Sequence, residues 1–162
     1  DKKTNIIFRN YNNKLNITKI KILRDLCKKK GCNFFLSNNV KFAIKLKLDG
    51  VYLPSFNKSF NHLAYSFKKK FIILGSAHSL HELNIKKLQA VKFFFISSLF
   101  KRNKNYLGIY KFKFFENFTK KKLVALGGIN EKNIKKLSLL DIYGYAGISF
   151  FQKKRPLKKG AL

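Results

Sequence analysis

Short apolar runs alternate along this chain with longer stretches in which apolar residues recur at helical spacing. The apolar runs are rich in β-branched and aromatic residues and are nearly continuous. Such runs are typical of strands in a parallel sheet, whose two faces are both covered. The segments that fit this pattern are predicted as strands: Ile6–Phe8, Phe34–Leu36, Gly50–Leu53, Phe71–Leu74, Phe93–Ile96, Leu123–Leu126 and Gly144–Ile148.

The stretches between these runs carry the start and stop signals of helices. Thr18 can cap a helix that Gly31 ends. Ser79 and Glu82 have the spacing of a capping box. Asn130 can cap a third helix, beginning at the next residue. Alternating strands and helices predict an α/β fold with a parallel sheet, either doubly wound or closed as a barrel.

The length of the chain, 162 residues, favours a single domain with a real hydrophobic core. A (β/α)8 TIM barrel has eight strands, so the seven predicted βα units fall one short. We expect the first strand and helix to be missing, and the absence of any Met also suggests a fragment or a processed form. We predict one N-terminally incomplete barrel domain over residues 1–151 and a basic C-terminal tail over residues 152–162.

The net charge of +29, from 36 Lys and Arg against 7 Asp and Glu, first suggests a polyanionic partner. The lysine clusters, however, fall in or at the ends of predicted helices: Lys28–Lys30, Lys68–Lys70, Lys120–Lys122 and Lys135–Lys136. No single element carries a basic stripe interleaved with aromatic residues. We therefore expect solvated helix faces and a composition shaped by AT-rich DNA, and not a nucleic-acid surface. The positive field would still attract phosphorylated metabolites.

Other classes of protein are disfavoured by what the sequence lacks. There is no apolar run of about 18 residues and no signal peptide at the start, which predicts no membrane partner and a cytoplasmic location. Cys27 and Cys32 have no second cysteine pair and no nearby His, so buried or idle thiols are expected instead of a zinc site or a disulfide. An unpaired strand edge would allow a homodimer.

Polar residues follow the predicted strands, where a βα barrel binds its ligands. They are Arg9, Ser37–Asn39, Pro54–Ser55, Gly75–Ser79, Ser97–Ser98, Gly127–Asn130 and Ile148–Ser149. These hydroxyls, amides and glycines, with one Arg and one His, suit oxyanions, whereas the lack of carboxylates suits Mg²⁺ poorly. Gly127 and Gly128, before a capped helix, form either a phosphate cradle or a generic tight turn.

Six motifs in the same order carry a resemblance to a known family. They are Ile7–Tyr11, Asp49–Pro54, Ser76–Ser79, Ile96–Phe100 followed by Leu107–Gly108, Ala125–Ile129 and Ala146–Ile148. The chain resembles the thiamine phosphate synthase and thiazole tautomerase (TenI) superfamily, and looks closest to a bacterial thiamine-phosphate pyrophosphorylase branch. The resemblance implies a (β/α)8 barrel that couples an aminopyrimidine diphosphate to a thiazole phosphate and releases diphosphate, with Mg²⁺ on the diphosphate and a pyrimidine carbocation.

The resemblance also implies roles for individual residues. Arg9 and Ser76 lie at positions that bind the diphosphate, and Asn38, Tyr52, Ser98 and Gly108 line the pocket. The positions that hold the thiazole phosphate through main-chain N–H groups are Gly127, Gly128, Ile148 and Ser149. Lys104 lies one residue before the family's loop Lys and is a catalytic candidate together with His78.

Several residues depart from the family pattern. Asn38 and Asn57 stand where the family has metal-binding Asp residues, so the Mg²⁺ of the family is in doubt here. Tyr11 replaces a Lys, Pro54–Ser55 replaces Gly-Gln, and Ser98 stands where the tautomerase branch has a His. A synthase-like enzyme is therefore one hypothesis. A thiazole-phosphate or thiamine-phosphate binding barrel, or a tautomerase-like one, is the alternative.

The three His residues and Tyr52 each have two readings. His78 can act as a general acid or base, but no partner carboxylate is evident, and a structural role is favoured. His62 and His81 lie on predicted helices and are expected at the surface. Tyr52 can stack on an aromatic ligand or belong to the core.

Overall fold

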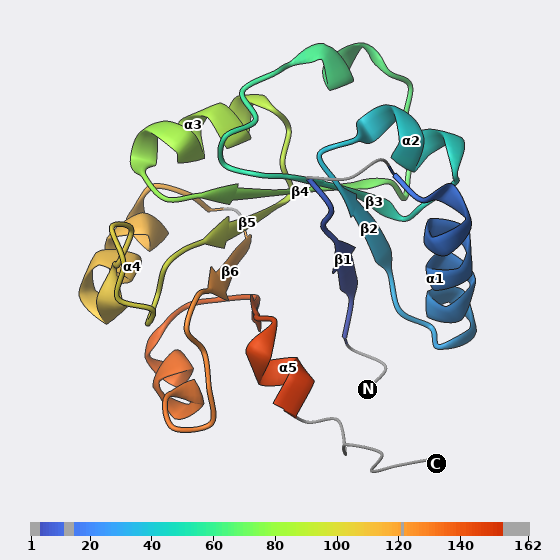
Figure 1. Cartoon of the computed structure of the whole chain (residues 1–162). Helices are drawn as coiled ribbons and strands as arrows, with labels where there is room; N and C mark the ends of the chain where they lie inside the picture. The colour runs from blue at the N-terminus through green and yellow to red at the C-terminus, as the bar shows by residue number, and fades with distance from the viewer. Residues whose placement is uncertain (1–3, 12–14, 121, 154–162) are drawn as a thin grey trace, which may run out of the picture. The chain divides into compact units, whose positions relative to one another are not determined.

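The computed structural model describes residues 4–11, 15–120 and 122–153, and the chain divides into two compact units, Asp1–Phe93 and Phe94–Leu162. The elements are drawn in Figure 1. Those of the first unit are β1 (Ile6–Phe8), α1 (Ile17–Lys29), β2 (Phe34–Ser37), α2 (Val40–Lys45), β3 (Gly50–Leu53), the 3₁₀ helix η1 (Asn61–Ala64), β4 (Ile72–Ala77) and α3 (Leu80–Leu88).

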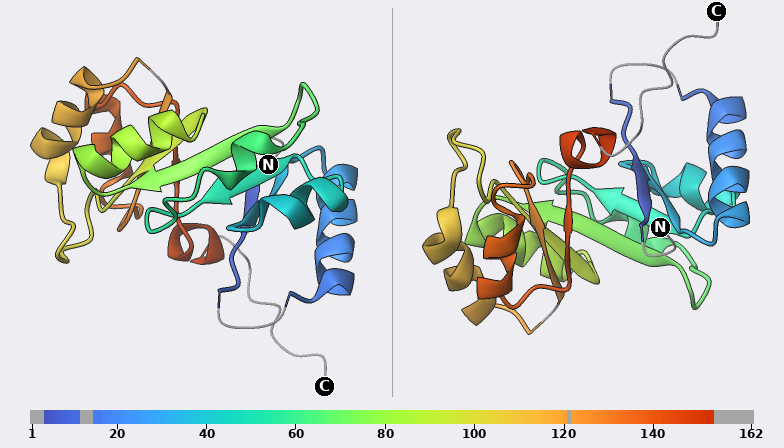
Figure 2. Two further views of the ribbon diagram at one scale, coloured as in Figure 1. Left: turned by 90° about the horizontal axis from the view of Figure 1, so that it is seen from above. Right: turned by 90° about the horizontal axis from the view of Figure 1, so that it is seen from below.

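The first unit contains a parallel sheet in which β1, β2, β3 and β4 follow one another in chain order. Strands β2 and β3 are buried along their whole length, which explains why both read as continuous apolar runs. In both views of Figure 2, α1 stays on one side of β1 and β2. The polar residues that follow the strands lie at the carboxyl ends of those strands.

The second unit repeats the strand and helix alternation. Its elements are β5 (Phe93–Ile96), α4 (Gly108–Asn117), β6 (Lys122–Leu126), the 3₁₀ helix η2 (Ile134–Leu139), β7 (Gly144–Ala146) and α5 (Ser149–Lys153). Strands β5, β6 and β7 follow in chain order, and β6 and β7 are parallel. Phe94 and Ile96 from β5, Phe112 from α4 and Ala125 from β6 are fully buried in its core.

The helix signals of the sequence are confirmed in part. The side chain that caps α1 is Asn16, which accepts a hydrogen bond from the Lys19 N–H at 2.9 Å, so the prediction of Thr18 is wrong. Ser79 caps α3 by accepting from the Glu82 N–H at 3.2 Å, as predicted. The Glu82 carboxylate accepts from the N–H of His78 at 2.6 Å, one residue before the cap.

The third predicted helix differs most from expectation. The oxygen of the Asn130 side chain accepts from the N–H groups of Lys132 and Asn133, at 2.9 and 3.1 Å, and thereby closes a turn. The helix that follows is a 3₁₀ helix that begins only at Ile134. Asn130 therefore caps a turn, and the α-helix predicted directly after it is not formed.

At the level of fold class, the prediction of a parallel α/β fold is confirmed, and all seven predicted strands occur. The cluster Lys68–Lys70 lies in a turn before β4 and not at the end of a helix. Residues 154–162 of the predicted basic tail lie outside the described residues, and Lys153 belongs to α5. Within the described part of the chain, no helix has the length and apolarity needed to span a membrane.

Candidate functional site

Residues after β1 and β2 form the first part of the candidate site. The hydroxyl groups of Tyr11 and Ser37 share a hydrogen bond of 2.7 Å. The Arg9 guanidinium lies over the Tyr11 ring, 5.3 Å from its centroid, and the ring of Phe56 packs edge-on against Tyr11 at 5.5 Å. Tyr11 therefore links the guanidinium to the end of β2.

Tyr52 of β3 and Ser76 of β4 form the second part. Both side chains are buried, and they are joined by a hydrogen bond. Burial raises the pKa of the Tyr52 hydroxyl, while the bond with Ser76 and the nearby Arg9 charge oppose the rise. Tyr52 and Ser76 thus lie together within the ends of β3 and β4, close enough to Arg9 for its charge to act on Tyr52, and the Arg9 guanidinium has donors to offer an oxyanion.

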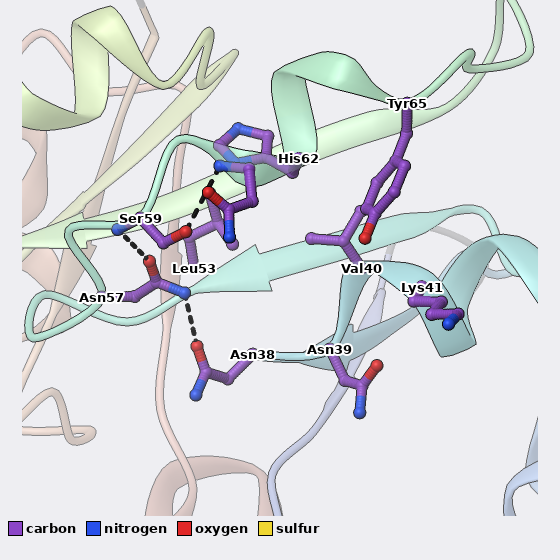
Figure 3. A pocket seen from close by; sticks show the side chains of 10 residues that line it. Asn38, Asn39, Val40, Lys41, Leu53, Asn57, Ser59, His62 and Tyr65 are labelled. Atoms are coloured by element: carbon purple, nitrogen blue, oxygen red, sulfur yellow. Dashed lines mark hydrogen bonds between the residues drawn. The ribbon is translucent and has the colours of Figure 1, made fainter.

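Asn38 and Asn57 contact each other directly. The Asn57 Nδ2 donates to the Asn38 Oδ1 at 2.7 Å, as Figure 3 shows. Asn38 has a positive φ of 58°, a conformation that Asn tolerates better than most residues. Its N–H donates to the Tyr52 carbonyl oxygen at 2.8 Å, so the Asn pair is tied to the end of β3.

Two cavities flank this Asn pair. One, of about 250 Å³, lies between the start of α2 and the segment after β3, and Lys41, His62 and Tyr65 contribute to its wall (Figure 3). The other, of about 260 Å³, is lined by Tyr11, Ser37 and Phe56. Both cavities share Asn38 and Asn39. Most of the groups around them are neutral hydrogen-bonding side chains.

Lys86 of α3 and Gln89, the C-cap of this helix, are buried and hold Asn57 in place, and neither was predicted as a site residue. The Lys86 Nζ donates to the Asn57 carbonyl oxygen at 2.6 Å and to the Gln89 Oε1 at 2.8 Å. The Gln89 Nε2 donates to the Asn57 and Ser59 carbonyl oxygens at 3.1 and 2.8 Å. Lys86 and Gln89 are both 0% exposed. Burial lowers the pKa of the Lys86 ammonium to about 8, partly countered by the charge of Glu82.

Three histidines take different places. His62 is buried, with its Nε2 2.9 Å from the Gln89 carbonyl oxygen, so the prediction of a surface His62 is wrong. His81 is exposed, as predicted. His78 is partly buried directly after β4, and its N–H is bound by the Glu82 carboxylate. The cap of α3 thus fixes the backbone at His78.

The Asn pair does not fit a divalent metal ion. The Asn38 Oδ1 accepts from Asn57, and the Asn57 Oδ1 accepts from the Ser59 N–H at 2.9 Å and from the Gln89 Nε2 at 3.4 Å. Mg²⁺ prefers carboxylate oxygens, and here a buried ammonium lies behind the pair. Within the described ranges, no three His, Cys, Asp or Glu side chains are grouped as a metal site would require.

In the second unit, the turn Gly127–Gly128 packs against the segment after β5. Both glycines have positive φ, 101° and 76°. A Cβ on Gly127 would lie 2.6 Å from the Ser98 Oγ, and one on Gly128 would lie 2.8 Å from the Phe100 carbonyl carbon. The Phe100 N–H donates to the Gly127 carbonyl oxygen at 2.8 Å. The chain's own backbone therefore explains the need for glycine, without any ligand.

The side chains after this turn bind the turn itself. The Asn133 Nδ2 donates to the Gly128 carbonyl oxygen at 2.8 Å, and the Asn133 Oδ1 accepts from the Asn130 N–H at 2.9 Å. Because η2 begins at Ile134 and has six residues, the α-helix dipole expected next to the glycines is not present. Phosphate binding at this turn would therefore depend on the turn's own N–H groups, with Gly128 exposed to solvent.

The remaining predicted residues lie around the same unit. The Ser98 Oγ donates to the Lys101 carbonyl oxygen at 2.9 Å, and the Gly108 N–H, at the start of α4, donates to the Leu99 carbonyl oxygen at 3.1 Å. Ser98, Gly108 and the glycine turn are thus grouped around one loop. Lys104 is exposed within that loop. Ile148 and Ser149 are exposed at the start of α5.

The sequence is similar to known proteins over most of its length. A family described as "Thiamine monophosphate synthase" matches residues 3–151. The thiamine-phosphate synthase of Helicobacter pylori (strain Shi470) is 29% identical over 143 residues, which is 85% of this chain and 63% of that protein. The chain thus spans less than two thirds of that relative's length.

Solved structures show the same likeness. The thiamine phosphate pyrophosphorylase from Pyrococcus furiosus aligns with a TM-score of 0.69 and 25% identity, over 82% of this chain and 65% of that one. A thiamine phosphate pyrophosphorylase from Bacteroides thetaiotaomicron aligns with a TM-score of 0.63 over 96% of this chain and 75% of that one, and at 13% identity it supports the fold alone. With the family match covering nearly the whole described chain, this protein belongs to the thiamine monophosphate synthase family.

Proposed function

We propose that this chain is the main part of a (β/α)8 barrel that couples an aminopyrimidine diphosphate to a thiazole phosphate and releases diphosphate. The main support for this proposal is that residues 3–151 match the thiamine monophosphate synthase family. The grouping of Arg9, Tyr52 and Ser76 at the ends of β1, β3 and β4 supports it, because donors without competing carboxylates suit a diphosphate. We expect the reaction to take place in the cytoplasm.

In this proposal the two units hold different phosphate groups. Arg9 and Ser76 bind the diphosphate, and the main-chain N–H groups at Gly127, Gly128, Ile148 and Ser149 bind the thiazole phosphate. Asn38 and Tyr52 are the proposed pocket residues of the first unit, and Ser98 and Gly108 are those of the second. Lys104 is exposed on the loop before Gly108, so it is free of the core and available to a ligand that reaches this loop. His78, with its backbone fixed by Glu82, has a structural role.

The test is a coupling assay with both substrates and the full-length protein. Release of diphosphate and formation of thiamine phosphate are expected, and Arg9→Met should slow the reaction strongly. Lys19→Met, which removes an exposed positive charge from α1, is the matched control and should leave the rate within about twofold. An Arg9→Met variant as fast as the wild type would contradict the proposed diphosphate site.

The second candidate function is a barrel that binds thiazole phosphate or thiamine phosphate without turnover. The Asn38–Asn57 hydrogen bond favours it, because neutral amides supply no charge to a metal-bound diphosphate. It predicts a rise in the melting temperature with either phosphate at millimolar concentration and no product in the coupling assay. The two functions are separated by product formation, whereas the absence of any thermal shift removes the binding function.

A further inference from the structure

Lys86 brings a positive charge into the interior of the first unit. Its side chain runs past Gly75, where an added Cβ would lie 3.0 Å from the Lys86 Cδ, and it ends at the Asn57 carbonyl oxygen. A solvated lysine would lose hydration here, so the site must provide other acceptors. Asn57 and Gln89 provide them, at 2.6 and 2.8 Å.

The two oxygens that accept from this ammonium, on Asn57 and Gln89, are neutral. The carboxylate that acts on the pKa of this ammonium is that of Glu82, one helical turn earlier on α3. That carboxylate accepts a hydrogen bond from the His78 N–H. Two neutral oxygens accept from two of the three N–H groups of the ammonium but leave its charge in place. Asn57 forms part of the cavity wall, so the positive charge behind it raises the electrostatic potential in the cavity.

The wall in front of Lys86 is the Asn38–Asn57 pair. Its Oδ1 atoms accept from Asn57, Ser59 and Gln89. An Asp pair would attract a cation and repel a phosphate unless the cation were bound. A neutral pair backed by an ammonium has the opposite preference, because both amide N–H groups and the positive field favour an anion.

We propose that the cavity beside Asn38 and Asn57 binds the phosphate groups of its ligand without a divalent cation, and that Lys86, held by Gln89, supplies the charge. The inference rests on the proposed function, because Asn38 is one of its pocket residues and the ligand is the same phosphate-bearing one. Lys86 acts through Asn57 and is a positioning residue. Its charge is part of the protein, so ligand binding does not depend on metal concentration.

The first experiment uses the wild-type protein at pH 7 with inorganic diphosphate as the probe. Isothermal titration in EDTA should show binding, and added Mg²⁺ should leave the affinity unchanged or weaken it, because Mg²⁺ competes for free diphosphate. Mn²⁺ should not broaden the side-chain amide NMR signals of Asn38 and Asn57. Binding that appears only with Mg²⁺, or no binding in either buffer, overturns the proposal.

A set of variants tests the role of Lys86. Lys86→Met keeps the buried stem and should weaken diphosphate binding in EDTA roughly fivefold to tenfold, as expected for a buried charge that acts on the ligand through Asn57. Lys45→Met, which removes an exposed charge from α2, is the control and should change the affinity less than about twofold. Equal losses in both variants would show that the general field, and not Lys86, attracts the ligand.

A second variant, which leaves Lys86 in place, tests the proposal even if Lys86→Met does not fold. Asn38→Asp together with Asn57→Asp should introduce Mn²⁺ binding, seen as line broadening, and should lower the affinity for diphosphate in EDTA. Unchanged diphosphate binding in this variant contradicts the proposal. Metal-free diphosphate binding by the wild type, without product in the coupling assay, would leave the inference intact while the proposed coupling reaction fails.

Discussion

Gly128 allows a closer approach of two loops than a side chain would permit. Its φ is 76°, and an added Cβ would lie 2.8 Å from the Phe100 carbonyl carbon. Gly128→Ala should therefore reduce the free energy of unfolding by about 2 kcal/mol or more, through backbone strain and the clash with a main chain that cannot turn away. Urea unfolding measures the loss.

Gly144→Ala is the matched control for this change. Gly144 lies in β7, has no positive φ, and a Cβ there would meet no atom within 4 Å. The substitution should alter the stability by less than about 0.5 kcal/mol. Equal stability of the Gly128 variant and the wild type would mean that the two loops are not packed as described.

The two cysteines should differ sharply in reactivity. Cys27 is buried, and burial, with a smaller contribution from Cys32, raises the pKa of its thiol to about 11. Cys32 is partly exposed. Iodoacetamide at pH 8.5 should thus modify Cys32 and leave Cys27 unmodified in the folded protein, and should modify both in guanidinium. Mass spectrometry of the peptides reads the two sites separately.

The same pKa shift predicts a pH dependence of stability. In the unfolded chain the Cys27 thiol loses its proton near its ordinary pKa of 9.0, whereas the folded state keeps it to about 11. The folded state binds more protons in that window, so this thiol's contribution falls as the pH rises from 9 to 11, by up to about 2 kcal/mol. Comparison with Cys27→Ala isolates the effect, and parallel pH curves for the two proteins would contradict it.

The sequence indicates some site residues and hides others for a physical reason. Arg9 and Ser76 follow or end apolar runs, and the ends of parallel strands meet at one edge, so their proximity is predictable. Lys86 belongs to a helix, where a lysine is usually solvated, and its burial depends on packing against Gly75. The sequence signal for its burial is position: Lys86 comes three residues after the core residue Leu83, so both lie on the same face of α3.

At the scale of elements, the cap of α1 is a testable correction. Asn16 accepts from the Lys19 N–H at 2.9 Å, and Thr18 lies within the helix. Asn16→Ala should lower the free energy of unfolding by about 1 kcal/mol, because an N–H of the first turn loses its acceptor. Thr18→Ala should be neutral or slightly stabilising, since Ala favours helix interiors. Denaturant titration of both variants decides which residue caps the helix.

The elements differ in how well the pattern predicts them. Strands β2 and β3 were predictable because both of their faces are buried, and a strand buried on both faces reads as a continuous apolar run. Asn16 and Thr18 have equally suitable side chains, and only the extended backbone at Asn16 selects it. After Gly128 the Asn130 and Asn133 side chains each accept from the other's N–H, as in a capping box, yet a turn and a 3₁₀ helix follow them in place of the predicted α-helix.

At the scale of the whole molecule, the net charge of +29 opposes compactness. Repulsion among so many like charges destabilises the folded state. Added salt weakens this repulsion, because it shortens the distance over which the charges act on one another. The midpoint of thermal unfolding should therefore rise by several degrees between about 0.05 and 0.5 M NaCl, which corresponds to about 1 kcal/mol or more.

Sodium phosphate at the same ionic strength separates screening from specific binding. Screening alone raises the midpoint equally in both salts, whereas a phosphate site adds a further rise because the ligand binds only the folded state. We expect the further rise in phosphate, and we expect Gly128→Ala, which distorts the glycine turn, to reduce it more than Gly144→Ala. A midpoint that does not change with NaCl would show that the positive charges are already neutralised within the fold, and equal curves in the two salts would count against a phosphate site in this chain.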